Sequence, residues 1–310
     1  MSGAPGVSIL LVVKNERANL EKILPRIAEQ AYAGPVEIVA IDSGSTDGTV
    51  ELLAEHGARV EEIPPPDFHH GRTRNQAAAL ARHKILVLLS GDALPADEQW
   101  LGALVTPFAD AAVGAVYGRQ IPPDTIEPVR ARYLASEYPL ARVVREIGVG
   151  TRIHPGLFRF SNANAAVRRS VWERFRWNET LSLAEDQGLC RDVLMDGMKV
   201  VYEPAAAVLH GHGRGLWGEF QYAFDNGLSL ARLGILNNPR IGGSTAYGLR
   251  RVREDLGYFL RRGRVDLAAR ATLVFMMKWL GVQAGKRGEW LPPWLLRRLS
   301  EVYSKGLPPR

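Results

Sequence analysis

A single cysteine, Cys190, is present among the 310 residues, so no disulfide can form within the chain. This scarcity favours a reducing compartment, because structural disulfides belong to oxidising ones. Long apolar runs are also missing: the most hydrophobic stretch, residues 271–277, ends at Lys278, well short of the roughly 20 residues that a spanning helix needs. We therefore expect a cytoplasmic protein without a transmembrane helix. The first apolar run, residues 7–13, follows no basic residue and is predicted to be a strand, not a signal peptide.

Low-complexity segments and internal repeats are absent as well, and a composition of 46% hydrophobic and 23% charged residues is that of an ordinary globular protein. The net charge of +6 is distributed unevenly. Residues 250–310 contain fourteen Lys or Arg and five Asp or Glu, an excess of nine positive charges, which leaves a net charge of −3 for residues 1–249. The basic character therefore belongs to the C-terminal region.

The segment 36–50, VEIVAIDSGSTDGTV, combines a strand, a turn and the start of a helix. Its β-branched apolar run is typical of a strand buried on both faces, and Asp42 stands where that strand ends. Ser43 begins the turn, and Asp47 is expected in the first turn of the helix. Ligands of open α/β sheets bind at the carboxyl ends of parallel strands, so Asp42 is a candidate nucleotide contact. The alternative is that Asp42 and Asp47 are only caps, each worth roughly 1 kcal/mol.

A second buried strand, residues 85–89, also delivers an Asp at its carboxyl end, in the sequence Ser90-Gly91-Asp92. Between the two strands, residues 67–75 read DFHHGRTRN and open an alanine-rich helix. Arg74 and the helix N–H groups there suit a phosphate, although a solvated basic loop is the alternative. Carboxylates on neighbouring strands beside a phosphate site predict a nucleotide with a divalent cation, and Asp92 is the candidate ligand.

Glu185 and Asp186 are predicted to open a later helix. Consecutive side chains on a helix point about 100° apart, so one carboxylate can act on a substrate while the protein holds the other. Alternatively, the pair only complements the helix dipole. His210 and His212 are two residues apart in a predicted strand, residues 205–212, and would share one face of it. Such a pair is a metal-ligand signal, although either His can simply hydrogen-bond a loop.

The remaining pattern predicts further strands and helices of an α/β protein. Residues 118–155 are expected to form a long loop that covers a site. Ser170 is expected to cap a short helix, and residues 199–202 to form a strand separate from residues 205–212. A linker rich in Pro, Gly and Asn at residues 237–244 is expected to lead into the basic helices of the C-terminal region.

Several motifs occur in the order found in a known family. Lys14-Asn15-Glu16 follows the first strand, IDSGSTDGT follows the second, one Asp follows the third, and Glu185-Asp186 stand about two dozen residues before a His. Over roughly residues 5–230 the chain resembles the inverting family 2 glycosyltransferases of the GT-A fold. The segments FHHGRTRNQAAALA and SGDALP, the downstream HGH and the later KWLGVQAGKR are similar to the bacterial rhamnosyltransferase branch.

The resemblance implies a Rossmann-like, mostly parallel sheet flanked by helices, with a helical extension at the C-terminal end. It implies a GT-A domain at residues 1–235, with a nucleotide-sugar-binding half at about 1–117 and an acceptor-binding, catalytic half at about 118–235. The basic helical region would then be residues 236–310.

The resemblance also implies a role for each candidate residue. Asp42 contacts the base or ribose, Asp92 and one His bind Mg2+ or Mn2+ on the diphosphate, and His210 is favoured over His212 by its distance from Glu185-Asp186. Asp186 is the general base, with Glu185 the next candidate. Further nucleotide-sugar-binding candidates are Val13, Asn15, Glu16, Ser43, Gly71, Arg74, Asn75, Gly91 and Asn162. Gly91 stands where the branch usually has Gln, and the first Asp of the common DxD motif is lacking.

The implied reaction transfers L-rhamnose from dTDP-L-rhamnose to a hydroxyl of a glycan or lipid-linked acceptor, and a UDP- or GDP-sugar donor is the alternative. A nucleotidyltransferase is disfavoured because residues 12–16 contain no glycine where it has a glycine-rich loop. A binding protein for nucleic acid would leave the strand-end carboxylates unexplained, so no nucleic-acid partner is expected. The basic, Trp-containing C-terminal helices predict a peripheral membrane contact. Packing on the catalytic domain or a homodimer contact is the alternative.

Overall fold

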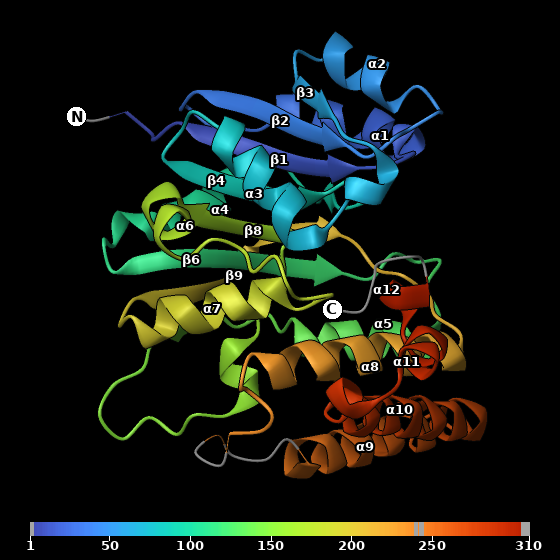
Figure 1. Cartoon of the computed structure of the whole chain (residues 1–310). Helices are drawn as coiled ribbons and strands as arrows, with labels where there is room; N and C mark the ends of the chain where they lie inside the picture. Colours follow the sequence, from blue (N-terminus) through green and yellow to red (C-terminus); the bar gives the residue numbers. More distant parts are fainter. Residues whose placement is uncertain (1–2, 239–240, 242–244, 305–310) are drawn as a thin grey trace.

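The computed structural model describes residues 3–238, 241 and 245–304, and its centre is a nine-stranded sheet (Figure 1). The strands are β1 (Val7–Val13), β2 (Val36–Asp42), β3 (Arg59–Glu62), β4 (Ile85–Ser90), β5 (Leu94–Pro95), β6 (Val113–Ile121), β7 (Val143–Arg145), β8 (Asn164–Arg168) and β9 (Lys199–Leu209). Their order is β3-β2-β1-β4-β8-β6-β9-β5, with β7 also paired to β9. Strands β1 to β4 pair in parallel, and β8 runs antiparallel between β4 and β6.

Helices connect and flank these strands, so the predicted α/β class is confirmed. They are α1 (Arg17–Ala28), α2 (Thr49–Glu55), α3 (His70–Leu80), α4 (Trp100–Val105), α5 (Pro128–Glu137), α6 (Arg169–Phe175), α7 (Glu185–Met195) and α8 (Leu216–Arg232). The C-terminal region adds α9 (Thr245–Leu260), α10 (Val265–Gly285), α11 (Pro293–Leu299) and α12 (Glu301–Ser304). These four helices lie together below the sheet in Figure 1, next to α8.

The central strands are buried on both faces. Along β1, Ile9 and Leu11 belong to one hydrophobic cluster, and Leu10 belongs to the other. Successive side chains of a strand point to opposite faces, so two cores form, one on each side of the sheet. Each fully buried Leu or Ile contributes about 1.5–3 kcal/mol. This double burial is why these strands appear in the sequence as continuous apolar runs.

The parallel register brings the predicted site residues to one edge of the sheet. Val13 of β1 pairs with Asp42 of β2, and Val12 pairs with Ser90 of β4. The carboxyl ends of β2, β1 and β4 therefore lie side by side, and Asp92 follows two residues after β4. Asp42 and Asp92 thus lie at the same edge of the sheet, but the expectation that their strands are neighbours is wrong, because β1 pairs with both and separates β2 from β4.

Two predictions about helix starts are wrong. Asp47 is not in the first turn of α2, because the helix begins at Thr49 after Gly48, whose φ of +86° favours glycine. Ser170 does not cap α6; it is the second residue of that helix, which begins at Arg169. Strand β8 passes directly into α6 at Arg168, so the chain leaves no turn in which a polar side chain could serve as the cap.

The expected loop at residues 118–155 is also wrong, because it contains the end of β6, all of α5 and β7. Helix α5 buries only Val129 and Leu134, so its own sequence pattern is weak. The two strands expected at 199–202 and 205–212 are one strand, β9, with a register shift that accommodates Pro204. Consequently His210 and His212 lie just beyond a strand and not within it.

The C-terminal helices pack directly on the rest of the protein. A Cβ added at Gly281 would lie 2.4 Å from Phe220 O, and one added at Gly285 would lie 2.2 Å from Phe224 O, so α10 and α8 approach backbone to backbone. The linker predicted at residues 237–244 falls mostly outside the described residues. Among the helices that the structure describes, none has both the length and the apolar character to cross a bilayer.

Candidate active site

Asp42 organises the turn at the end of β2. Its side chain is fully buried, and Oδ2 accepts hydrogen bonds from the N–H groups of Gly44 and Ser45, each at 2.8 Å. Oδ1 accepts a bond from the Ser45 hydroxyl. Ser43 N donates to Val13 O at 3.0 Å and ties the turn to β1. The observed contacts of Asp42 are those of a cap on its own turn, and its role toward a nucleotide stays a prediction.

The KNE segment after β1 is locked to the same turn. Asn15, with a φ of +54°, accepts a bond from Thr46 N at 2.8 Å, and Asn15 N donates to Ser45 Oγ at 2.7 Å. Glu16 approaches Gly91, where an added Cβ would lie 2.9 Å from Glu16 Cγ. Burial raises the pKa of Glu16, and the charge of Asp92 adds to the effect. The loops after β1, β2 and β4 therefore form one connected rim.

Asp92, His210 and His212 form a cluster with the composition of a metal site. Asp92 Oδ1 lies 3.4 Å from His210 Nε2, and Oδ2 lies 3.0 Å from His212 Nε2. One ligand atom from each residue falls within 4.8 Å of the other two. Although burial alone would raise the pKa of Asp92, hydrogen bonds and charge from the two histidines hold it well below its usual range. The structure thus brings together the three residues predicted as metal ligands.

The two histidines are not equivalent. His210 is mostly buried, and its Nδ1 lies 3.0 Å from Gln120 Oε1, so Nδ1 can donate to Gln120 while Nε2 faces Asp92. Metal-binding histidines commonly use the second ring nitrogen in this way, which fixes the ring orientation. His212 is half exposed, with 52% of its side chain accessible. Sequence reasoning missed Gln120, because it lies ninety residues before its partner.

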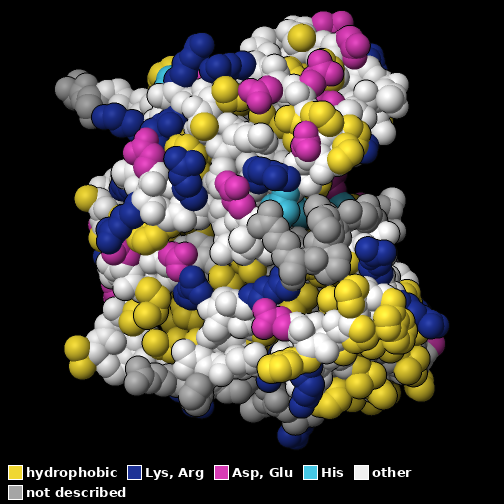
Figure 2. Space-filling model, viewed as in Figure 1, with side chains coloured by type: hydrophobic (Ala, Val, Ile, Leu, Met, Phe, Trp, Pro, Cys, Tyr) yellow, Lys and Arg dark blue, Asp and Glu magenta, His cyan; other side chains and the backbone are white. Residues whose placement is uncertain are grey.

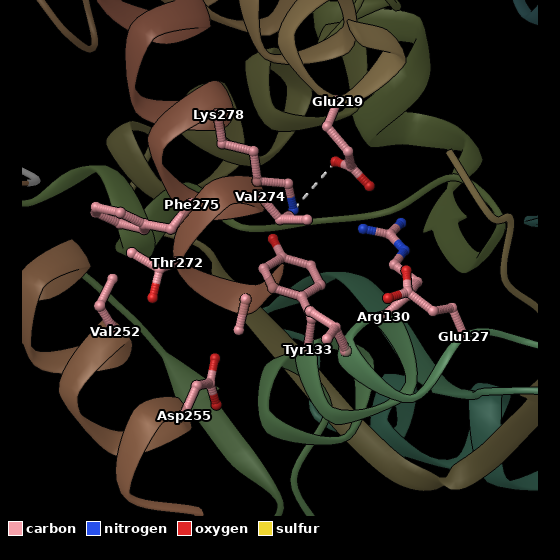
Figure 3. A pocket seen from close by; sticks show the side chains of 12 residues that line it. Glu127, Arg130, Tyr133, Glu219, Val252, Asp255, Thr272, Val274, Phe275 and Lys278 are labelled. Carbon is pink, nitrogen blue, oxygen red and sulfur yellow. Dashed lines mark ion pairs between the residues drawn. The ribbon is translucent and has the colours of Figure 1, made fainter. Parts of the chain in front are cut away.

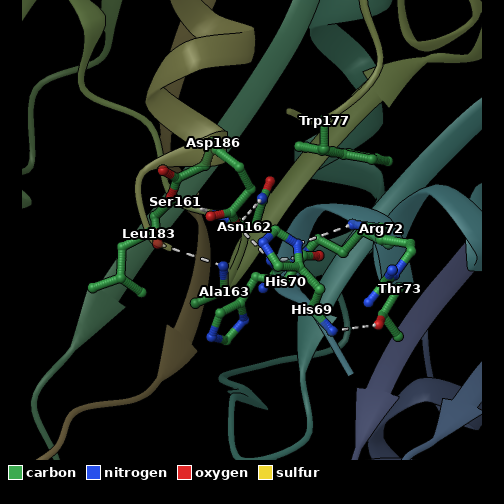
Figure 4. Close-up of polar contacts among 12 residues, drawn as sticks. His69, His70, Arg72, Thr73, Ser161, Asn162, Ala163, Trp177, Leu183 and Asp186 are labelled. Atoms are coloured by element: carbon green, nitrogen blue, oxygen red, sulfur yellow. Dashed lines mark hydrogen bonds and ion pairs between the residues drawn. The ribbon is translucent and has the colours of Figure 1, made fainter. Parts of the chain in front are cut away.

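Glu185 and Asp186 have different environments, as predicted for consecutive residues on a helix. The buried Glu185 forms an ion pair with Arg74 of α3 and accepts a bond from Asn162 Nδ2 at 3.2 Å. Asp186 accepts backbone bonds, from Gln187 N at 2.7 Å and from Asn162 N at 3.4 Å. Figure 4 shows Asp186 beside Asn162, with the His69-His70 turn nearby. Among the described residues, Arg74 pairs with Glu185, and no cation forms an ion pair with Asp186.

These environments move the two pKa values apart. Burial would raise the pKa of Glu185, but the positive charges of Arg74 and His70 outweigh it, and the pKa is lowered. The pKa of Asp186 is raised to about 7, first by burial and then by the adjacent charge of Glu185. Two carboxylates on adjacent residues repel each other when both are ionised, so the one paired with the cation takes the charge. Asp186 is thereby poised as a proton acceptor near neutral pH.

Arg74, the predicted phosphate contact, forms an ion pair with Glu185. Asn75 and Gly71, two further candidates for donor binding, make contacts that pack α3 against the rest of the protein. Asn75 Nδ2 donates to Trp177 O at 2.8 Å, and its Oδ1 accepts from Trp172 Nε1 at 2.9 Å. A Cβ added at Gly71 would lie 2.1 Å from Asn178 O. Together with Ser90 and Asn162, Arg74 lines a small cavity of about 20 Å³ between the ends of β1 and β4.

Helix α8 adds residues that the sequence did not single out. Asn226 Oδ1 accepts a bond from Gln187 Nε2 at 3.4 Å, directly next to Asp186. Burial raises the pKa of Tyr222, one turn earlier, and the charge of Asp186 also acts on it. The guanidinium of Arg214 lies 4.2 Å from the centre of the Tyr222 ring. The spacing of Tyr222 and Asn226 places both on one face of α8, which is the only sequence signal they carry.

A larger cavity, of about 60 Å³, lies between α5, α8, α9 and α10 (Figure 3), and neither Glu185 nor Asp186 lines it. Lys278 Nζ reaches into it, 3.5 Å from Glu219 Oε2 and 3.6 Å from the centre of the Tyr133 ring. Burial lowers the pKa of Lys278 to about 8. Arg132 and Asp255 form a further ion pair at 3.2 Å across the same helices. Of the charged side chains that line this cavity, Lys278 pairs with Glu219, whereas Arg130 Nε is buried and has no hydrogen-bond partner among the described residues.

Comparison with known proteins gives relatives for nearly the whole chain. The chain is 30% identical to the O-antigen chain rhamnosyltransferase RfbN of Salmonella typhimurium over 289 residues, which cover 92% of this chain and 91% of that protein. It is 31% identical to the O-antigen chain rhamnosyltransferase WbaN of Salmonella anatum over 264 residues, 83% of this chain and 82% of the relative.

Solved structures share the fold at lower sequence identity. The mannosyltransferase PcManGT from Pyrobaculum calidifontis, in complex with GDP-Man and Mn2+, superposes with a TM-score of 0.61 at 20% identity, covering 92% of this chain and 87% of that one. The S. aureus TarS fragment 1-349 superposes with a TM-score of 0.54 at 14% identity, covering 98% and 93%. The expected GT-A fold is thereby confirmed.

The sequence model described as "Glycosyl transferase family 2" matches residues 8–175, which hold the three strand ends of the site and the Arg74 helix. The RfbN and WbaN relatives extend the match over Asp186 and the histidines. The chain therefore belongs to glycosyl transferase family 2 and is a glycosyltransferase.

Proposed function

We propose that this glycosyltransferase moves L-rhamnose from dTDP-L-rhamnose to a hydroxyl of a glycan or lipid-linked acceptor, with inversion at the anomeric carbon. Two relatives at about 30% identity are named as rhamnosyltransferases of the O-antigen chain, which supports the sugar and a glycan acceptor. The observation that carries the chemistry is the pair Glu185 and Asp186, in which Arg74 neutralises Glu185.

In this proposal Asp186 takes the proton of the acceptor hydroxyl as that oxygen attacks the sugar from the face opposite the leaving diphosphate. A single displacement of this kind needs one base and no covalent intermediate. Glu185 is unsuited to the role because Arg74 holds its carboxylate. Its negative charge instead adds to the effect of burial in raising the pKa of Asp186, which favours proton acceptance there. Asn162, which contacts both carboxylates, positions them relative to each other.

The residues present also fit a divalent cation, Mg2+ or Mn2+. One carboxylate and one or two imidazoles, converging within 4.8 Å, supply the oxygen and nitrogen ligands that such ions accept beside a diphosphate. Asp92 and His210 would hold the ion, with His212 as the third candidate. Bound there, it would neutralise charge that develops on the leaving diphosphate.

The donor is proposed to lie along the rim formed by the loops after β1, β2 and β4. The rim residues proposed to contact it are Val13, Asn15, Glu16, Asp42, Ser43, Gly91 and Asp92. From α3 and the loop before β8, the proposed contacts are Gly71, Arg74, Asn75 and Asn162. Acidic strand ends repel phosphates unless a cation lies between them, so this donor site depends on the proposed metal.

Calorimetry with purified full-length protein tests the donor. We expect dTDP-L-rhamnose with Mn2+ to bind at least about tenfold more tightly than UDP- or GDP-sugars, a difference of about 1.4 kcal/mol. Removal of the metal with a chelator should weaken binding. Equal affinity for all three nucleotides would contradict the dTDP donor, and tighter binding of a GDP- or UDP-sugar would replace it.

A further inference from the structure

Helix α10 exposes an apolar stripe to solvent. Leu273, Met276 and Leu280 follow one another at intervals of three and four residues, so they lie on one face of the helix. Together with Trp279, each of them is between 44% and 50% exposed. The opposite face is already used, because Gly281 and Gly285 pack on the backbone of α8. The exposed stripe is therefore not the face by which α10 packs on the rest of the protein.

Two tryptophans extend this surface. Trp290 is 86% exposed and Trp294 is 65% exposed, so neither ring packs into the core. Figure 2 shows hydrophobic side chains gathered at the lower right of the molecule, over the region where Figure 1 places α10 and α11. We call this surface the α10–α11 face and define it by Leu273, Met276, Trp279, Leu280, Trp290 and Trp294. Exposed apolar groups gathered in this way mark an interaction site.

The unpaired charges next to the face are positive, since Glu289, beside Trp290, is paired with Arg232. Arg287, Arg297 and Arg298 are exposed and adjacent to it in the sequence. Within the part of the chain that the structure describes, no carboxylate pairs with any of the three. They belong to the region of residues 250–310 in which positive charges exceed negative ones by nine. The partner of the α10–α11 face must therefore be negatively charged as well as apolar.

We infer that the α10–α11 face binds the surface of an anionic lipid bilayer, with α10 lying along the membrane and not across it. Tryptophan favours the boundary between headgroups and acyl chains, and arginine pairs with anionic headgroups. A second copy of the chain is a poorer partner, because a symmetric contact would bring two surfaces of the same positive charge together. This inference stands independently of the proposed donor and base.

Sedimentation with vesicles tests the inference on the full chain. The protein is mixed with vesicles of phosphatidylcholine alone, or with one third phosphatidylglycerol, at low and high salt. We expect binding to the anionic vesicles, weakened by salt and at least about tenfold weaker with neutral vesicles, because several basic residues each contribute to the attraction. Trp290→Ser with Trp294→Ser should lose most of the binding, and so should Arg297→Glu with Arg298→Glu.

The matched control is Leu140→Ser with Val149→Ser, which removes exposed apolar side chains elsewhere and should leave binding unchanged. Circular dichroism and donor affinity check that each variant is folded. Equal sedimentation with neutral and anionic vesicles would overturn the inference, as would Trp variants that bind like the control. If ultracentrifugation shows a dimer that the Trp variants dissociate, and vesicles bind nothing, the partner is a second copy.

Discussion

Arg74 and Glu185 are 111 residues apart in the sequence and form a buried ion pair beside the proposed base. The pair fixes the side chain of Glu185 and leaves the negative charge of that residue next to Asp186. A buried pair of this kind is costly to break, because the remaining charge loses its partner. The ion pair therefore decides which of two adjacent carboxylates can take a proton.

Replacement of Asp186 by Asn should lower the transfer rate by roughly 10² to 10⁴, because an amide cannot accept the acceptor proton. Donor affinity, measured by calorimetry, should change little. Asp192→Asn, on the same helix but paired with Arg191, is the matched control and should keep the wild-type rate. If Asp186→Asn retains more than about half of the activity, another group is the base.

The rate should depend on pH through Asp186. The base acts only when deprotonated, and its pKa is raised to about 7, so transfer should increase as the pH rises through about 7 and level off above it. In Glu185→Gln the adjacent negative charge is gone, which favours the ionised form of Asp186. The rising limb should then move to lower pH. A limb that stays in place in this variant would contradict the coupling of the two carboxylates.

Metal affinity should distinguish the two histidines. His210→Ala should weaken Mn2+ binding more than His212→Ala, since Gln120 orients the second ring nitrogen of His210 and no described residue is seen to do so for His212. Gln120→Leu should cost roughly 10- to 100-fold in affinity, the usual effect of removing such a partner. Asp92→Ala should weaken the binding of both Mn2+ and the nucleotide. His56→Ala, a control outside the cluster, should change neither affinity. The reverse order for the histidines would make His212 the ligand.

Asp225 should make stability depend on pH. Its Oδ2 accepts bonds from Glu301 N and Val302 N at the start of α12, and burial raises its pKa to about 6 from an ordinary 3.8. The fold thus favours the protonated form. Protonated Asp225 contributes its full stabilisation below about pH 4. As the pH rises through about 6, this contribution is lost, and the free energy of unfolding falls by up to about 3 kcal/mol.

Denaturant titrations at pH 4.5 and pH 7 measure this loss. Asp225→Asn cannot ionise, so it should gain stability relative to the wild type as the pH rises over this interval. Asp97→Asn, which replaces an exposed carboxylate, should follow the wild type at both pH values. Parallel curves for wild type and Asp225→Asn would show that Asp225 stays ionised in the folded protein.

The sequence predicted the parts of the fold that depend on local pattern. Strands β1, β2 and β4 could be located because burial on both faces demands uninterrupted apolar residues. The location of the candidate site could then be predicted from these strands, because Asp42 ends β2 and Asp92 follows β4. Helix α5 could not be predicted, because ion pairs with α9 and α10 support it and these partners come more than a hundred residues later.

Contacts between residues far apart in the sequence also explain which features of the site could not be predicted. Nothing near Arg74 in the sequence indicates that its guanidinium faces Glu185 and not only a phosphate. Gln120 appears as an ordinary polar residue on a strand until β9 brings His210 beside it. Side-chain roles that depend on such pairings become visible only when the sheet is assembled.

The two glycines of α10 have a mechanical consequence. Because Gly281 and Gly285 lie directly against the α8 backbone, the two helices are in close backbone contact and are expected to move together. Helix α8 in turn holds Asn226 against Gln187, the neighbour of Asp186. If α10 lies on a membrane, as inferred above, these contacts would also set the height of Asp186 above that membrane. With Asp186 as the base, as proposed, an acceptor hydroxyl would then have to be presented at that same height above the membrane.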